Sequence, residues 1–95
     1  MTSSESWRSP CRISSPALLA DVLRRVADAV QSGDLRQLAP SDEPFATKTD
    51  VREIPPNGPW PDFIDIRFVE SGSGRHYRLF AETYRGAGGV WEMIE

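Results

Sequence analysis

The side chains that could do acid–base chemistry in this 95-residue chain are few. His76 is the only histidine, so any mechanism with an imidazole general base must use it. Its neighbours on the predicted strand are arginines, which disfavour an imidazolium, and no serine or cysteine lies near it in the predicted sheet. Glu82 and Glu92 are predicted to face each other and could titrate as a coupled pair. On a flat, exposed sheet such a pair is typical of a solvated row, so the sequence does not indicate an enzyme.

Two arginines are the more informative charged residues. Arg67 and Arg78 are predicted to lie directly opposite each other on one face of a β-hairpin. Like charges at opposed positions are unfavourable unless another group compensates them. Asp65 and Glu82, at diagonal positions, could supply that compensation within the chain. Alternatively, the guanidinium groups could bind an anion or a carboxylate of a partner, because arginine recognises such groups bidentately.

Apolar side chains lie on the same predicted face as these arginines. A single helix can cover only one side of the sheet, so this face is either covered by the N-terminal tail or meets another molecule. We expect a protein partner or a homodimer contact here. The candidate partner-binding residues are Arg67, Arg78, Phe80, Tyr84, Val90, Ile94 and Trp60.

The element that positions these residues is a hairpin predicted over residues 63–84, with its loop at residues 71–74. Period-two alternation gives three apolar pairs on one face: Phe68 with Tyr77, Ile66 with Leu79, and Ile64 with Ala81. A slip of one residue would pair Phe68 with Arg78, so the pattern itself selects the register. The same register places Glu70 opposite Arg75 as an exposed pair.

A glycine-rich turn over residues 85–89 leads to a last strand predicted over residues 90–94. No helix N-terminus or lysine follows the glycines, so they do not indicate a phosphate-binding loop. Pairing Tyr84 with Val90 places Trp91 and Met93 on the apolar face of the hairpin. All three strands then share one core face.

A helix is predicted to begin after Ser15, with Pro16 at its first position, and to end before Gly33. Its apolar residues recur at spacings of three and four: Leu19, Val22, Leu23, Val26 and Val30. Residues 34–38 are expected to add one helical turn before Pro40.

Residues 45–54 alternate between apolar and charged side chains and predict an edge strand. Four prolines then fall within residues 55–61, where no regular element can form. Trp60 in this loop either caps one end of the core or presents its ring to a partner.

Residues 1–14 are predicted to be a flexible tail, and residues 15–95 a single domain. Trp7 in the tail either lies against its own domain or docks on another molecule. The lone Cys11 excludes an intramolecular disulfide and a Cys-x-x-Cys metal site, and no metal or cofactor is indicated.

A net charge of −3 and the absence of a basic stripe argue against nucleic acid as a partner. No apolar run approaches the roughly 20 residues that cross a bilayer, so no membrane partner is expected. The first residues lack the apolar core of a secretory signal, and we therefore expect a cytoplasmic protein.

The sequence therefore predicts an α+β fold, with one N-terminal helix packed on one face of a four-stranded, mainly antiparallel meander sheet. The function it favours is a small, non-enzymatic protein-binding or regulatory module of bacterial type that uses the open sheet face, such as an immunity protein or an accessory subunit. The alternative is a domain that binds a small ligand or anion, or a catalytic domain, with its site between the proline-rich and glycine-rich loops. That site would use Trp60, Arg67, Arg78 and His76.

Overall fold

The computed structural model describes residues 7–39, 47–83 and 88–94 of the chain. The elements in these ranges are β1 (Cys11–Ile13), α1 (Pro16–Ser32), β2 (Leu35–Gln37), the 3-10 helix η2 (Val51–Glu53), β3 (Phe63–Glu70), β4 (His76–Glu82) and β5 (Gly88–Met93). The five strands form one antiparallel sheet in the order β1-β5-β4-β3-β2. The predicted α+β class is confirmed, but the described residues form five strands where four were predicted.

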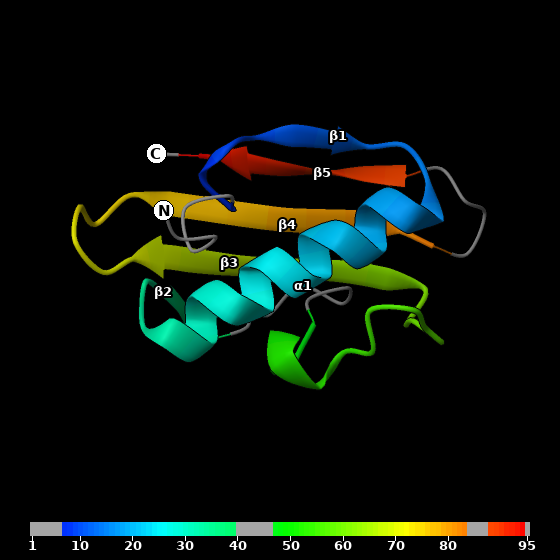
Figure 1. Cartoon of the computed structure of the whole chain (residues 1–95), viewed down its shortest axis with the longest axis horizontal. Helices are drawn as coiled ribbons and strands as arrows, with labels where there is room; N and C mark the ends of the chain where they lie inside the picture. Colours follow the sequence, from blue (N-terminus) through cyan, green and yellow to red (C-terminus); the bar gives the residue numbers. More distant parts are fainter. Residues whose placement is uncertain (1–6, 40–46, 84–87, 95) are drawn as a thin grey trace.

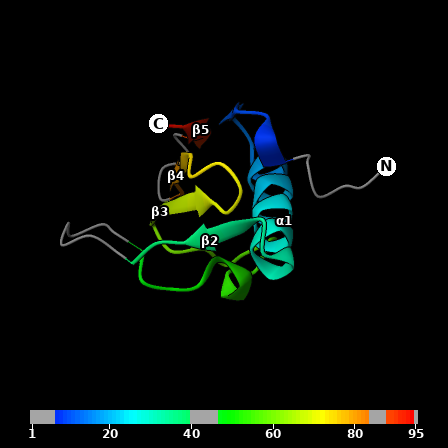
Figure 2. The same cartoon turned by 90° about the vertical axis from the view of Figure 1, so that its left-hand side faces the viewer.

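α1 lies on one side of the sheet and connects its two edge strands. Figure 1 shows the helix crossing in front of the strands, and Figure 2 shows it beside the sheet. β1 precedes the helix at one edge of the sheet, and β2 follows it at the other. The core lies between these layers, and its largest fully buried side chains are Trp7, Trp91, Phe68, Leu23, Leu35, Ile64, Leu79, Val26 and Val51.

The helix begins and ends where its capping residues predict. The hydroxyl of Ser15 accepts a hydrogen bond from the backbone N–H of Leu18, and Pro16 occupies the first turn. Gly33 follows the last helical residue with a positive φ of 91°. The buried residues of α1 form one stripe: Leu19, Ala20, Val22, Leu23, Val26 and Ala29.

The central hairpin has the predicted register. β3 and β4 pair Phe68 with Tyr77, Ile66 with Leu79, and Ile64 with Ala81, and all six side chains are buried. The backbone N–H of Glu70 donates to the carbonyl of Arg75, so these residues close the loop as expected. The Glu70 side chain is nevertheless buried, and its ion pair is formed with Arg8 instead of with Arg75.

β5 pairs with β4 in a register that differs from the prediction. Trp91 lies opposite Leu79 instead of Thr83, and Val90 lies opposite Phe80. The shift is an even number of residues, so Trp91 keeps its predicted place on the core face and is buried. The strand begins two residues earlier than predicted, at Gly88, because glycines give no side-chain alternation from which its start could be recognised.

Residues 7–14 belong to the folded domain, and predicting them as a flexible tail was wrong. Cys11–Ile13 form the edge strand β1 against β5. Trp7 is 1% exposed and packs edge-on against Tyr77, with ring centroids 5.3 Å apart, so it lies against its own domain. A three-residue strand is too short to show a period in the sequence. Residues 1–6 lie outside the described residues.

The predictions for residues 34–38 and 47–54 were also wrong. Residues 35–37 form β2 beside β3 instead of a helical turn, because Leu35 is buried in the core when this segment is extended. Residues 47–54 contain no strand, since the Asp50 carboxylate accepts a hydrogen bond from the N–H of Arg52 and begins η2. The remaining predicted strand residues, 45 and 46, lie outside the described ranges.

The Gln37 side chain connects β2 to the segment before η2. Its amide nitrogen donates to the carbonyl of Thr49 at 3.0 Å, and its oxygen accepts from the N–H of Val51 at 2.8 Å. One side chain thus satisfies one backbone carbonyl and one backbone N–H of this segment.

Candidate protein-binding surface

The sheet has a second face, which points away from α1 (Figure 2). By strand alternation it carries Phe63, Asp65, Arg67 and Val69 of β3; His76, Arg78, Phe80 and Glu82 of β4; Val90 and Glu92 of β5; Arg12 of β1; and Arg36 of β2. We call this the open face. Its residues are half-buried or exposed, whereas the core-facing positions of β3 and β4 are buried.

Arg78 is held within the open face by an internal ion pair. Its Nε and Nη2 donate to the two carboxylate oxygens of Asp65 at 3.0 and 3.1 Å. Its guanidinium also lies 4.9 Å from the ring centroid of Phe80. Asp65 therefore compensates Arg78 within the chain, as one of the two interpretations predicts. Arg67 does lie opposite Arg78 in the register.

Three arginines of the open face remain exposed: Arg12, Arg36 and Arg67. None of them forms an ion pair with another residue in the described ranges 7–39, 47–83 and 88–94. Arg36 lies opposite Val69, so it is diagonal to Arg67, at about 7–8 Å. The sequence did not identify Arg12 or Arg36, because their strands are short. The sequence feature that could have identified them is their position next to Ile13 and Leu35, which are buried.

Apolar side chains occupy the middle of the open face. Phe80 and Val90 are direct neighbours across β4 and β5, and Arg12 lies beyond Val90 on β1. Ile94 follows β5, is 43% exposed, and its N–H donates to the carbonyl of His76. Four of the predicted site residues, Arg78, Phe80, Val90 and Arg67, are therefore on one surface. Tyr84 lies outside the described residues.

The carboxylates of the open face do not form the predicted pair. Glu82 lies opposite Gly88, and Glu92 lies opposite Arg78. The altered register of β5 separates the two glutamates and places Glu92 beside a cation. His76 lies opposite Val69 at the other end of the hairpin from Glu82. The predicted pairing of Glu82 with Glu92 was therefore wrong.

Trp60 is not on the open face. Its ring packs against the core, and its indole N–H donates to the carbonyl of Pro55 at 2.9 Å. It forms one wall of a pocket of about 90 Å³, which is also lined by Ile13, Ser14, Ser15, Pro16, Leu19, Ala81, Glu82, Thr83 and Gly88. A pocket between the proline-rich loop and the glycine-rich segment thus exists, but it contains none of Arg67, Arg78 and His76.

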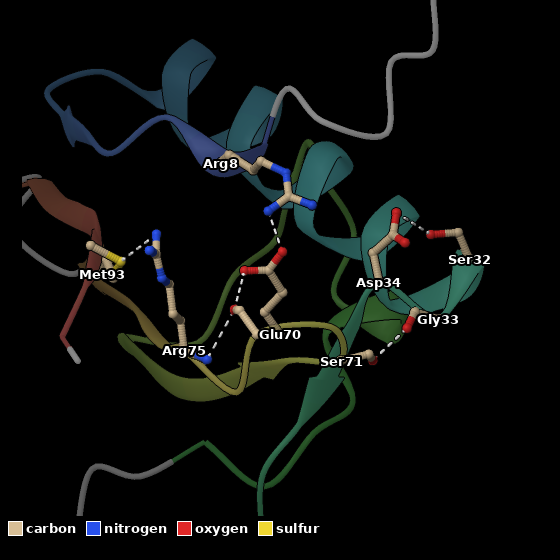
Figure 3. Close-up of polar contacts among 9 residues, drawn as sticks. Arg8, Ser32, Gly33, Asp34, Glu70, Ser71, Arg75 and Met93 are labelled. Carbon is tan, nitrogen blue, oxygen red and sulfur yellow. Dashed lines mark hydrogen bonds and ion pairs between the residues drawn. The ribbon is translucent and has the colours of Figure 1, made fainter.

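A polar cluster fixes the end of the molecule where the hairpin loop lies (Figure 3). The buried Glu70 carboxylate accepts hydrogen bonds from the Ser73 hydroxyl, at 2.7 Å, and from Arg8. The hydrogen bond from Ser73, assisted by Arg8, holds the pKa of Glu70 below its usual value, although burial opposes this. The Ser71 hydroxyl donates to the carbonyl of Gly33 at 2.6 Å. The cluster joins the N-terminal segment, the end of α1 and the hairpin, and its role is structural.

The described residues contain no group of three or more histidine, cysteine, aspartate or glutamate side chains that could hold a metal ion. No helix in the described ranges is long and apolar enough to cross a membrane.

Comparison with known proteins adds no family to this geometry: no protein-family model, no curated protein and no solved structure matches the chain.

Proposed function

We propose that this protein is a small, non-enzymatic protein-binding or regulatory module whose open face binds an acidic region of a protein partner. The observation that carries the proposal is the set of three exposed arginines, Arg12, Arg36 and Arg67, without ion pairs in the described residues. The acidic residues of the same face are all half-buried, and Asp65 is already bound to Arg78.

The exposed arginines of the open face do not stabilise the fold. This supports a role for them in binding an acidic partner. The whole chain has a net charge of −3, so an exposed positive face is a local feature. Arg67 lies opposite Arg78 and diagonal to Arg36. Each directly opposed pair of like charges lowers the stability of the sheet by about 0.2–1 kcal/mol. Carboxylates of a partner would remove this repulsion, and bidentate pairs with arginine would also fix the partner's orientation.

The middle of the face supports a protein, instead of a free anion, as the ligand. Phe80 and Val90 lie between Arg12 at one edge of the sheet and Arg36 at the other. Apolar residues in the centre with charged residues around them are typical of protein interfaces. A symmetric homodimer through this face would place the three exposed arginines of each copy in one interface, so a different, acidic protein is favoured. Roles such as an immunity protein or an accessory subunit in the cytoplasm fit this proposal.

The test is affinity capture with the tagged full chain from cells that make it, followed by mass spectrometry and binding measurements with the purified partner. Arg36→Glu/Arg67→Glu should weaken binding at least about tenfold, because it places like charges against the partner's carboxylates. Arg24→Glu/Arg25→Glu is the matched control, because it changes the net charge equally on exposed positions of α1. Equal binding by both double variants would contradict the proposal.

A further inference from the structure

The pocket beside Trp60 has a preformed, apolar wall. Trp60 is fixed by its hydrogen bond to Pro55, and Leu19 and Ala81 behind it are buried. Two of the hydroxyls in its lining are already used: Ser15 caps α1, and Thr83 donates to the carbonyl of Pro61 at 2.5 Å. The other polar side chains of the lining are Ser14 and Glu82, and the surface of the pocket is mainly apolar.

Its size decides what it can hold. Pockets for metabolites and drug-sized ligands usually measure about 300–1,000 Å³, whereas this one measures about 90 Å³. A water molecule needs only about 10–15 Å³, and an apolar cavity of about 150 Å³ holds benzene. A volume between these limits fits the branched end of one aliphatic side chain.

The pocket also adjoins the open face. A second, open hollow lies next to it, and both are lined by Ile13, Ser14, Glu82 and Gly88. This second hollow extends over Phe80, Val90 and Arg12. A chain that lies on the open face can therefore reach the pocket around the end of β1 without passing through the core.

We propose that this pocket receives one aliphatic side chain from the acidic segment of the protein partner, next to a carboxylate that binds Arg12. This inference rests on the proposed function, since it names how the partner is anchored. Arg12 is the cation available for that carboxylate, because it is exposed and forms no ion pair within the described residues, whereas Glu82 has interactions of its own. A single apolar side chain in a preformed pocket is often a hot spot, which contributes a large part of the binding free energy of a protein interface.

The test uses the 15N-labelled full chain and small probes, so it does not need the partner. The indole N–H groups of Trp7, Trp60 and Trp91 give separate NMR signals. The signal that is missing in Trp60→Phe belongs to Trp60. N-acetyl-leucinamide should shift the Trp60 signal with a Kd on the order of 10 mM, while the buried Trp7 and Trp91 signals stay in place. N-acetyl-asparaginamide is the polar control and should shift none of them.

The acidic component is tested with two dipeptides. N-acetyl-aspartyl-leucinamide should bind about two- to fivefold tighter than N-acetyl-asparaginyl-leucinamide, and Arg12→Gln should abolish the difference. Ser14→Phe, which adds a ring at the rim, should block binding, and Ser14→Asn should not.

The outcomes separate this proposal from the proposed function. No shift with the leucine probe, or an equal shift with the asparagine probe, overturns the pocket assignment even if charge reversal at Arg36 and Arg67 abolishes partner capture. A Trp60 shift confined to the leucine probes supports it even if partner capture ignores those arginines. Equal affinity of the two dipeptides overturns the role of Arg12.

Discussion

The indole N–H of Trp91 donates a hydrogen bond to the backbone carbonyl of Trp7, 84 positions earlier in the chain. The rings of Trp91 and Tyr77 stack with centroids 5.3 Å apart, and Trp7 lies edge-on to Tyr77. Three aromatic rings thus join the N-terminal segment to the last strand. Residues 7–13, before α1, therefore contribute to the stability of the fold.

Substitutions of Trp7 and Trp91 should show directly how much the N-terminal segment contributes to stability. Trp7→Ala should lower the free energy of unfolding by about 3–5 kcal/mol, because it removes a fully buried ring. Trp91→Phe should lower it by about 1–3 kcal/mol, since the Trp7 carbonyl loses its donor. Chemical denaturation measures both values. A Trp7→Ala variant as stable as the wild type would mean that the N-terminal segment is not part of the core.

The buried Glu70 carboxylate predicts a dependence of stability on pH. Its folded-state pKa lies below the usual value of a glutamate because Ser73 and Arg8 donate hydrogen bonds to it. Ionised Glu70 therefore stabilises the fold above about pH 4.5, and this contribution disappears as the pH falls through the folded-state pKa. Glu70→Gln should cost about 1–3 kcal/mol at pH 7.

The comparison with the neutral variant tests the sign of this effect. Denaturation of wild type and Glu70→Gln between pH 7 and pH 3 should give curves that converge at the acidic end. A difference that stays constant or grows on acidification would contradict a lowered pKa of Glu70.

Gly89 should tolerate no side chain. An added Cβ would lie 1.9 Å from the carbonyl oxygen of Phe80 and 2.6 Å from Cα of Ala81, so β4 and β5 would have to separate. We expect Gly89→Ala to cost at least about 1–3 kcal/mol. Gly72→Ala is the matched control, because nothing lies within 4 Å of its Cβ position and it should change stability by less than about 0.5 kcal/mol. Equal melting temperatures of the two variants would show that the β4–β5 contact is looser than described.

Replacing Arg67 or Arg78 by glutamine should have different effects on the stability of the fold. Arg78→Gln should destabilise the fold by about 1–3 kcal/mol, because the Asp65 side chain is only 12% exposed and loses its ion pair. Arg67→Gln should be neutral or stabilising by up to about 1 kcal/mol, since it removes a like charge opposite Arg78. Thermal unfolding measures both changes. Loss of stability in Arg67→Gln comparable to that in Arg78→Gln would mean that Arg67 has a structural role.

The sequence could predict the central hairpin because every position in it carries information. Ile64, Ile66 and Phe68 of β3 each lie opposite an apolar residue of β4, so only one register satisfies both strands. β5 lacks this information at its start, where Gly88 and Gly89 have no side chains, and its register was wrong although its face was right. The open-face residues on β3 and β4 could therefore be placed, but not the neighbours of Glu92.

The edge strands could not be predicted for a different reason. β1 and β2 have three residues each, too few for alternation, and their place in the sheet depends on Trp7 and Leu35 entering the core. In residues 47–54 the alternation was present but misleading, because Asp50 and Gln37 satisfy the backbone through their side chains. The exposed Arg12 and Arg36 were missed together with their strands.

The bridge that Gln37 makes to Thr49 and Val51 makes this junction depend on the identity of one residue. A backbone ladder forms with almost any sequence, whereas an amide that donates and accepts at once needs glutamine or asparagine at the right reach. Replacing Gln37 by an apolar residue would deprive the carbonyl of Thr49 and the N–H of Val51 of their hydrogen bonds at the same time.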